Sequence, residues 1–178
     1  AAAGRGQVPA LVVKGQLLHD NAAITENTRV TIAGNPGYVE ASGMTLWGGV
    51  INLARRTNRL WIDGPGRLTL PITQDLDGKA LPTPQLLAID WKRRMEFQAN
   101  TAAFEGTVAA RSGGHLLKTD QLQAVLTQTI DFSNPRPAVR GSNGPGPELE
   151  EVRTRGSTFL ESRQFDEQGQ QNALSQFE

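Results

Sequence analysis

The feature that most constrains this chain is a succession of short apolar runs divided by turn residues. In residues 28–33 apolar and polar side chains alternate with a period near two, and residues 59–62 and 67–72 are further short runs. This period indicates a strand with one buried face, and β-branched residues pack well on a pleated surface. Turn clusters such as residues 34–37 and 63–66 separate the runs at spacings near ten residues. The pattern predicts an all-β protein with no substantial helix.

Two segments interrupt this pattern. Residues 73–85 contain an Asp-Leu-Asp-Gly stretch and two prolines, and residues 133–147 are dense in Pro and Gly. We predict that both are loop insertions. For residues 119–128 a helix competes with a strand, because Leu and Ala favour helices and Asp120 is a suitable cap. We prefer a strand, because the residues up to Ile130 extend the run. Pro71 is expected at a sheet edge or a strand end, since it has no backbone donor.

Charge and residue usage exclude several function classes. The 18 Lys and Arg balance the 18 Asp and Glu, so the chain lacks the basic character of a nucleic-acid binder. There is no Cys and there are two His, which excludes thiolate zinc sites and disulfides and leaves no multi-histidine site. Aligned on a calcium loop, residues 73–84 place Thr73 and Pro84 at ligand positions, where neither fits. We predict a protein that is not an enzyme and takes no metal or cofactor.

The remaining polar candidates have structural interpretations. His19 and His115 lack an associated nucleophile motif, and we interpret both as surface residues. Residues 92–94, Lys-Arg-Arg, form the densest basic cluster. This cluster suits lipid phosphates, but cations at a strand end more often form a solvated edge that discourages aggregation.

The domain organisation is simple. The 178 residues suit one domain, which we place at residues 7–178, with a disordered end at residues 1–6. The chain starts without Met or a leader, so we expect a piece of a longer protein. Its apolar runs are far shorter than the roughly 20 residues of a spanning helix.

An internal echo appears at an offset of 57 residues. It places Trp47 on Phe104, Gly49 on Gly106 and Ile51 on Val108. Each copy reads aromatic-x-Gly-x-β-branched, followed by a turn and a second apolar run. A repeated strand–turn–strand unit and an ordinary β-meander both explain this pattern.

Residues 95–110, Met-Glu-Phe-Gln-Ala-Asn-Thr-Ala-Ala-Phe-Glu-Gly-Thr-Val-Ala-Ala, resemble the recurring unit of the OstA-like family. The second part of that unit, Leu-x-x-Asp-x-Leu, is matched by residues 117–122. The family contains the periplasmic lipopolysaccharide-transport bridge proteins and the N-terminal domains of outer-membrane insertion proteins. The match covers about residues 95–126, and residues 59–68 resemble the unit more loosely. The two loop insertions depart from the family pattern.

The resemblance implies an open, rolled antiparallel β-jelly roll in the periplasm or cell envelope. It implies an apolar interior that holds acyl chains, and assembly with other envelope β domains or with itself through edge strands. The residues that we expect inside, as lipid contacts or as ordinary core, are Trp47, Ile51, Phe104, Val108, Leu122 and Leu126. We therefore predict a domain that binds or conducts amphipathic lipid such as lipopolysaccharide. The alternative is a scaffold module of the same fold that binds other proteins and no ligand.

Overall fold

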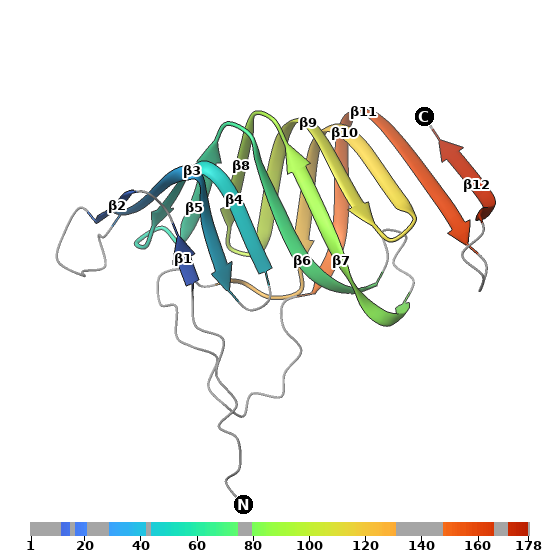
Figure 1. Ribbon diagram of the computed structural model, residues 1–178, viewed down its shortest axis with the longest axis horizontal. Helices are drawn as coiled ribbons and strands as arrows, with labels where there is room; N and C mark the ends of the chain where they lie inside the picture. Colours follow the sequence, from blue (N-terminus) through green and yellow to red (C-terminus); the bar gives the residue numbers. More distant parts are fainter. Residues whose placement is uncertain are drawn as a thin grey trace, which may run out of the picture.

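The computed structural model describes residues 12–14, 17–20, 29–41, 44–74, 80–130, 148–165 and 171–177. Over these residues it contains twelve antiparallel strands and no helix (Figure 1). The strands are β1 (Val12–Lys14), β2 (Leu17–Asp20), β3 (Arg29–Ala41), β4 (Met44–Ala54), β5 (Arg59–Asp63), β6 (Gly66–Gln74), β7 (Ala80–Trp91), β8 (Arg94–Gln98), β9 (Thr101–Ser112), β10 (His115–Leu126), β11 (Leu149–Phe165) and β12 (Gln171–Phe177). The all-β prediction is confirmed. The segment for which a helix competed, residues 119–128, is strand up to Leu126, where β10 ends, so the expected extension to Ile130 is wrong.

The sheet is folded into two walls that meet along a crease, which lies along the top in Figure 1. β4 pairs with β6 through residues 45–48 and with β5 through residues 51–54. β9 likewise pairs with β8 through residues 101–105 and with β7 through residues 109–111. We call the wall that contains β5 and β8 the β5 wall, and the wall that contains β6 and β7 the β6 wall. The long strands β3, β4, β9, β10 and β11 run through both.

The centre of the sheet is closed and its ends are apart. The pairings β4–β5–β8–β9–β7–β6 return to β4 and form a six-stranded ring. The strand order as a whole starts at β1 and ends at β12, and among the described residues these two strands are not paired with each other. The expectation of an open roll is therefore correct for the ends of the sheet and wrong for its central core.

Glycines make the crease on alternate strands. Gly64, Gly106 and Gly156 have φ angles of 101°, 80° and 93°. Only glycine adopts this left-handed region without steric cost, so the chain can bend sharply there. Gly64 lies between β5 and β6, and the other two lie within the continuous strands β9 and β11. The Arg-Gly pair at residues 155–156, between the apolar runs 149–154 and 157–162, predicts a turn between two strands, and this is wrong, because Gly156 bends β11 and does not end it.

The echo at offset 57 aligns the same place on two strands. Gly49 and Gly106 both lie where their strand changes partner from one wall to the other. Gly106 has a left-handed φ and Gly49 does not, so the echo matches position in the fold and not backbone conformation.

The first predicted loop insertion is largely strand. β6 continues to Gln74 and β7 begins at Ala80, so both strands extend into residues 73–85. Pro82 and Pro84 fit there because β7 pairs with β9 only through residues 88–90, which leaves their part of β7 on an edge. Pro71 lies where β6 has passed its last pairing with β4, as expected of an edge position. The second insertion, residues 133–147, lies outside the described residues.

The core fills the space between the two walls. Its buried apolar side chains form one cluster that extends from Ile32 in β3 to Leu149 in β11. Trp91 and Phe104 meet in its centre with ring centroids 5.3 Å apart. Burial of one large apolar side chain contributes about 1.5–3 kcal/mol, so this cluster is the main source of stability.

Candidate functional site

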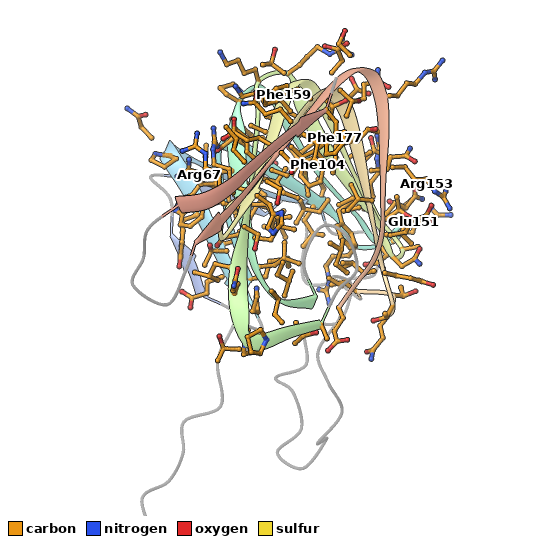
Figure 2. All side chains as sticks on the ribbon, turned by 90° about the vertical axis from the view of Figure 1, so that its right-hand side faces the viewer. Arg67, Phe104, Glu151, Arg153, Phe159 and Phe177 are labelled. Carbon is orange, nitrogen blue, oxygen red and sulfur yellow. The ribbon has the colours of Figure 1, made fainter. Side chains whose placement is uncertain are left out.

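Five of the six predicted interior residues lie in the core. Phe104, Val108 and Ile51 are fully buried. Leu122 is 1% exposed and Leu126 is 4% exposed. They come from β4, β9 and β10 and belong to the single apolar cluster between the walls. In Figure 2 Phe104 lies between the two walls of the fold.

Trp47 is the exception and lies on the opposite face of the sheet. Its register partners are Tyr38 and Arg67, and the two aromatic ring centroids are 5.4 Å apart. The neighbours Leu46 and Gly48 are the buried residues on this part of β4. A Cβ on Gly48 would approach the Ile62 side chain to 2.8 Å, so the inner face has no room there for a large ring. The prediction that Trp47 is an interior residue is therefore wrong.

One row of apolar side chains crosses the inner face of the β6 wall from β4 to β12. Successive register partners lie on the same face of an antiparallel sheet. The members of this inner row are Leu46, Leu68, Ile89, Ala110, Leu117, Leu160 and Phe177. The row is buried from Leu46 to Leu117, half-buried at Leu160 and 63% exposed at Phe177. The apolar interior therefore reaches solvent at the C-terminal end of the sheet.

The sequence did not single out the exposed end of this row. Leu160 follows Phe159, and the alternation does not decide which of the two faces inward. The register decides it, because Leu160 pairs with the buried Leu117 and Phe159 pairs with the exposed Lys118. Phe177 falls in a strand that the sequence did not predict.

A polar row runs beside the inner row on the last four strands. Its members are Ser112, His115, Ser162 and Ser175, each a register partner of the next. Ser112 is 2% exposed, and its hydroxyl meets the Gln85 amide oxygen at 3.5 Å. The His115 Nδ1 atom is buried and has no hydrogen-bond partner among the described residues. His115 is thus half-buried on the inner face and is not the plain surface residue that was predicted; the side chain of His19 lies outside the described residues.

The outer faces carry networks of ion pairs. On the β5 wall Arg59 donates two hydrogen bonds to Glu96, at 2.6 and 2.8 Å. On the β6 wall Arg67 and Arg111 both donate to Asp90. The hydrogen bond from Arg59 lowers the pKa of Glu96, and the hydrogen bond from Arg67 lowers the pKa of Asp90. Figure 2 shows Arg67 outside one wall, and Glu151 and Arg153 outside the other.

The basic cluster at residues 92–94 belongs to these networks. Lys92 and Arg93 form the bend between β7 and β8 in the middle of the sheet, so the prediction of a solvated edge is wrong. Arg93 pairs with Glu105 at 2.6 Å, and Arg94 pairs with Asp63 and Glu96. A shallow polar hollow of about 370 Å³ lies over β8 and β9 beside these pairs. Because acidic partners compensate both arginines, the cluster is a poor match for lipid phosphates.

Neither a metal site nor a membrane-spanning helix is found in the described part of the chain. No group of three or more His, Asp or Glu side chains is placed to hold a metal ion there. No helix long and apolar enough to cross a membrane is found among the same residues. The Asp-Leu-Asp-Gly stretch at residues 75–78 lies outside them.

The C-terminal end of the sheet also presents backbone edges. β12 pairs with the last arm of β11, through residues 160–165. The first arm of β11, residues 149–155, pairs with β10 on one side and with no described strand on the other. Unpaired N–H and C=O groups on an edge favour addition of another strand.

Comparisons with known proteins agree with this architecture. No protein-family model and no curated protein sequence matches the chain. Among solved structures it is similar to LptH from Pseudomonas aeruginosa, described as the LptA-homologous periplasmic component of the conserved lipopolysaccharide transport device. The similarity covers 82% of this chain and 94% of LptH, with a TM-score of 0.51 and 12% sequence identity. The chain therefore shares the fold of a periplasmic component of lipopolysaccharide transport.

Proposed function

We propose that this protein is a non-catalytic domain of the periplasm that binds an amphipathic lipid such as lipopolysaccharide. The observation that carries the proposal is the inner row, an apolar stripe that is continuous from the buried core to solvent at the C-terminal end. The fold shared with a lipopolysaccharide transport component supports it. Each CH₂ group that an acyl chain buries on such a surface contributes about 0.8 kcal/mol.

The burial pattern suggests an order of contacts. Leu160 and Phe177 are accessible without any change in the fold, so they meet the acyl chain first. Phe104 and Leu122 are already covered by protein atoms, so a chain reaches them, and with them Ile51, Val108 and Leu126, only where the walls separate. Trp47 takes no part, because it faces the outside.

The exposed edges extend the proposal to partners. The free arm of β11 and the outer edge of β12 suit strand addition by another envelope β domain or by a second copy of this chain. Pairing at the outer edge of β12 continues the inner row from one sheet to the next, which gives a lipid a longer apolar surface.

A scaffold module without a ligand is the second candidate. The observation that favours it is the dense core, since five predicted lipid contacts are at most 4% exposed. In this candidate the edges of the sheet serve the function and the interior serves only stability.

Photo-crosslinking on β12 separates the two candidates. Phe177 and Leu174 lie on the same strand and are 63% and 49% exposed, but they point to opposite faces. Each is replaced in turn by p-benzoylphenylalanine, and the purified protein is irradiated with lipopolysaccharide. We expect adducts from position 177 and few from position 174.

Equal labelling at both positions, or none at either, rejects the lipid proposal. Light scattering against protein concentration then tests the scaffold candidate. Concentration-dependent assembly that is lost when proline replaces Arg153 on the free arm of β11 supports it. A monomer at all concentrations counts against strand addition.

A further inference from the structure

We infer that the polar row is a subsite for the uncharged, hydroxyl-rich head group of an amphiphile, such as a sugar. The acyl chain of the same molecule lies on the neighbouring inner row. This inference rests on the proposed function and deepens it, because it names the part of the ligand that each row contacts.

The polar row and the inner row lie close enough together for one amphiphile to contact both. His115 and Leu117 are two residues apart on β10, and Leu160 and Ser162 are two apart on β11. Side chains two residues apart on a strand share a face and are about 7 Å apart. Ser175 and Phe177 repeat the pair on β12, so an apolar stripe and a polar stripe run side by side across three strands.

The polar row is confined to the end where the inner row reaches solvent. Farther into the sheet the corresponding places on β6 and β7 hold Leu70 and Leu87, which are 6% and 1% exposed. The change from leucine to serine and histidine does not increase the stability of the core, so stability alone does not explain it. The change suits a ligand whose polar part stays near the open end.

The His115 side chain is independent evidence that the polar row lacks a hydrogen-bonding partner. A buried nitrogen without a hydrogen bond is unfavourable, because nothing replaces the water that it loses on burial. The Nδ1 atom is in this state among the described residues, and the nearby Ser112 hydroxyl makes only a long contact of 3.5 Å. A ligand hydroxyl both donates and accepts hydrogen bonds, so it satisfies an imidazole nitrogen and a serine hydroxyl together.

The charges favour a sugar over a phosphate. The cations nearest in sequence are Arg111, Lys118 and Arg163, and their register places them on the outer face. Arg111 and Arg163 are also paired, with Asp90 and Glu161. The polar row itself contains hydroxyls and one imidazole, so it offers hydrogen bonds without a fixed positive charge.

The test compares two amphiphiles that share one chain. Dodecyl maltoside and dodecyl phosphate are titrated below their critical micelle concentrations into the whole protein, followed by calorimetry. We expect dodecyl maltoside to bind about tenfold more tightly, the effect of one or two net hydrogen bonds. Ser162→Ala and His115→Leu each weaken dodecyl maltoside about 2- to 10-fold and change dodecyl phosphate less than about 2-fold.

The matched control is Ser157→Ala, which removes a hydroxyl at the crease and leaves both affinities unchanged. If His115→Leu lowers the melting temperature, Ser175→Ala on the exposed strand β12 takes its place, and we expect the same loss of affinity for dodecyl maltoside. Equal affinities that no variant alters, or tighter binding of dodecyl phosphate, overturn the sugar subsite and leave the lipid proposal standing. If neither amphiphile binds, the proposed function itself fails.

Discussion

The middle and the C-terminal end of the interior lie on one continuous sheet and differ in what covers them. In the middle, the β5 wall lies against the β6 wall, and Phe104 and Ile51 are completely buried. At the end, β12 belongs to the β6 wall alone, so Leu160 is half-covered and Phe177 is largely exposed. The comparison separates a region that supplies stability from a region that is free to bind.

Substitution of one phenylalanine in the middle and one at the end tests this difference between the two regions, and we expect it to give the largest change in stability. Phe104→Ala leaves a cavity beside Trp91 and lowers the free energy of unfolding by about 3–5 kcal/mol. Phe177→Ala removes an exposed ring and changes it by less than about 0.5 kcal/mol. Urea unfolding followed by circular dichroism measures both. Similar losses for the two variants would erase the distinction between middle and end.

A smaller effect tests how rigid the middle is. Gly106→Ala forces a left-handed residue to carry a Cβ that approaches the Arg93 Cβ to 2.6 Å. We expect a loss of about 1–3 kcal/mol. Gly49→Ala is the matched control on β4, because it has an ordinary φ and open space around the new Cβ. A neutral Gly106→Ala would mean that the crease adapts and that the walls can change their angle.

The smallest effect concerns how β12 is held at the end. Glu161 accepts hydrogen bonds from Gln176 of β12 and from Arg163, and the bond from Gln176 is the main reason why its pKa is lowered. A carboxylate with a lowered folded pKa contributes stability above its unfolded pKa, and this contribution is lost as pH falls through the folded value. Hydrogen exchange of β12, corrected for intrinsic rates, is therefore expected to accelerate relative to β9 as the pH falls below 4.5, the ordinary pKa of a glutamate.

Glu161→Gln is the control for this prediction. It keeps an acceptor for Gln176 and removes the titration, so the difference between β12 and β9 becomes independent of pH. If the wild-type protein shows no such difference, the Glu161 contact does not hold β12 in place.

Much of the fold was predictable from local patterns. The alternation of apolar residues predicted strands in β4 to β11, and five of the six residues that the resemblance placed inside lie in the core. Local patterns failed where two apolar residues are adjacent, because the pairing with the neighbouring strand decides which of the two faces inward. Trp47 is the clear case, since the lack of space at Gly48 decides which face of β4 is inward.

The candidate site was harder to predict because it depends on strand order. Ser112, His115, Ser162 and Ser175 are far apart in sequence, and each is unremarkable on its own. They form a row only because β9, β10, β11 and β12 are neighbours in a fixed register. No local signal in the chain carries that information.

Local patterns in the chain are enough to predict strands β4 to β11 and the mainly apolar character of the inner face. Whether a glycine with positive φ reverses the chain or bends a continuous strand depends on how the strands pack in three dimensions. Gly113 lies in a hairpin turn and Gly156 in a crease, yet both have positive φ. The physical reason is that φ is a property of one residue, whereas a crease exists only where neighbouring strands bend together and pack their inner faces against each other.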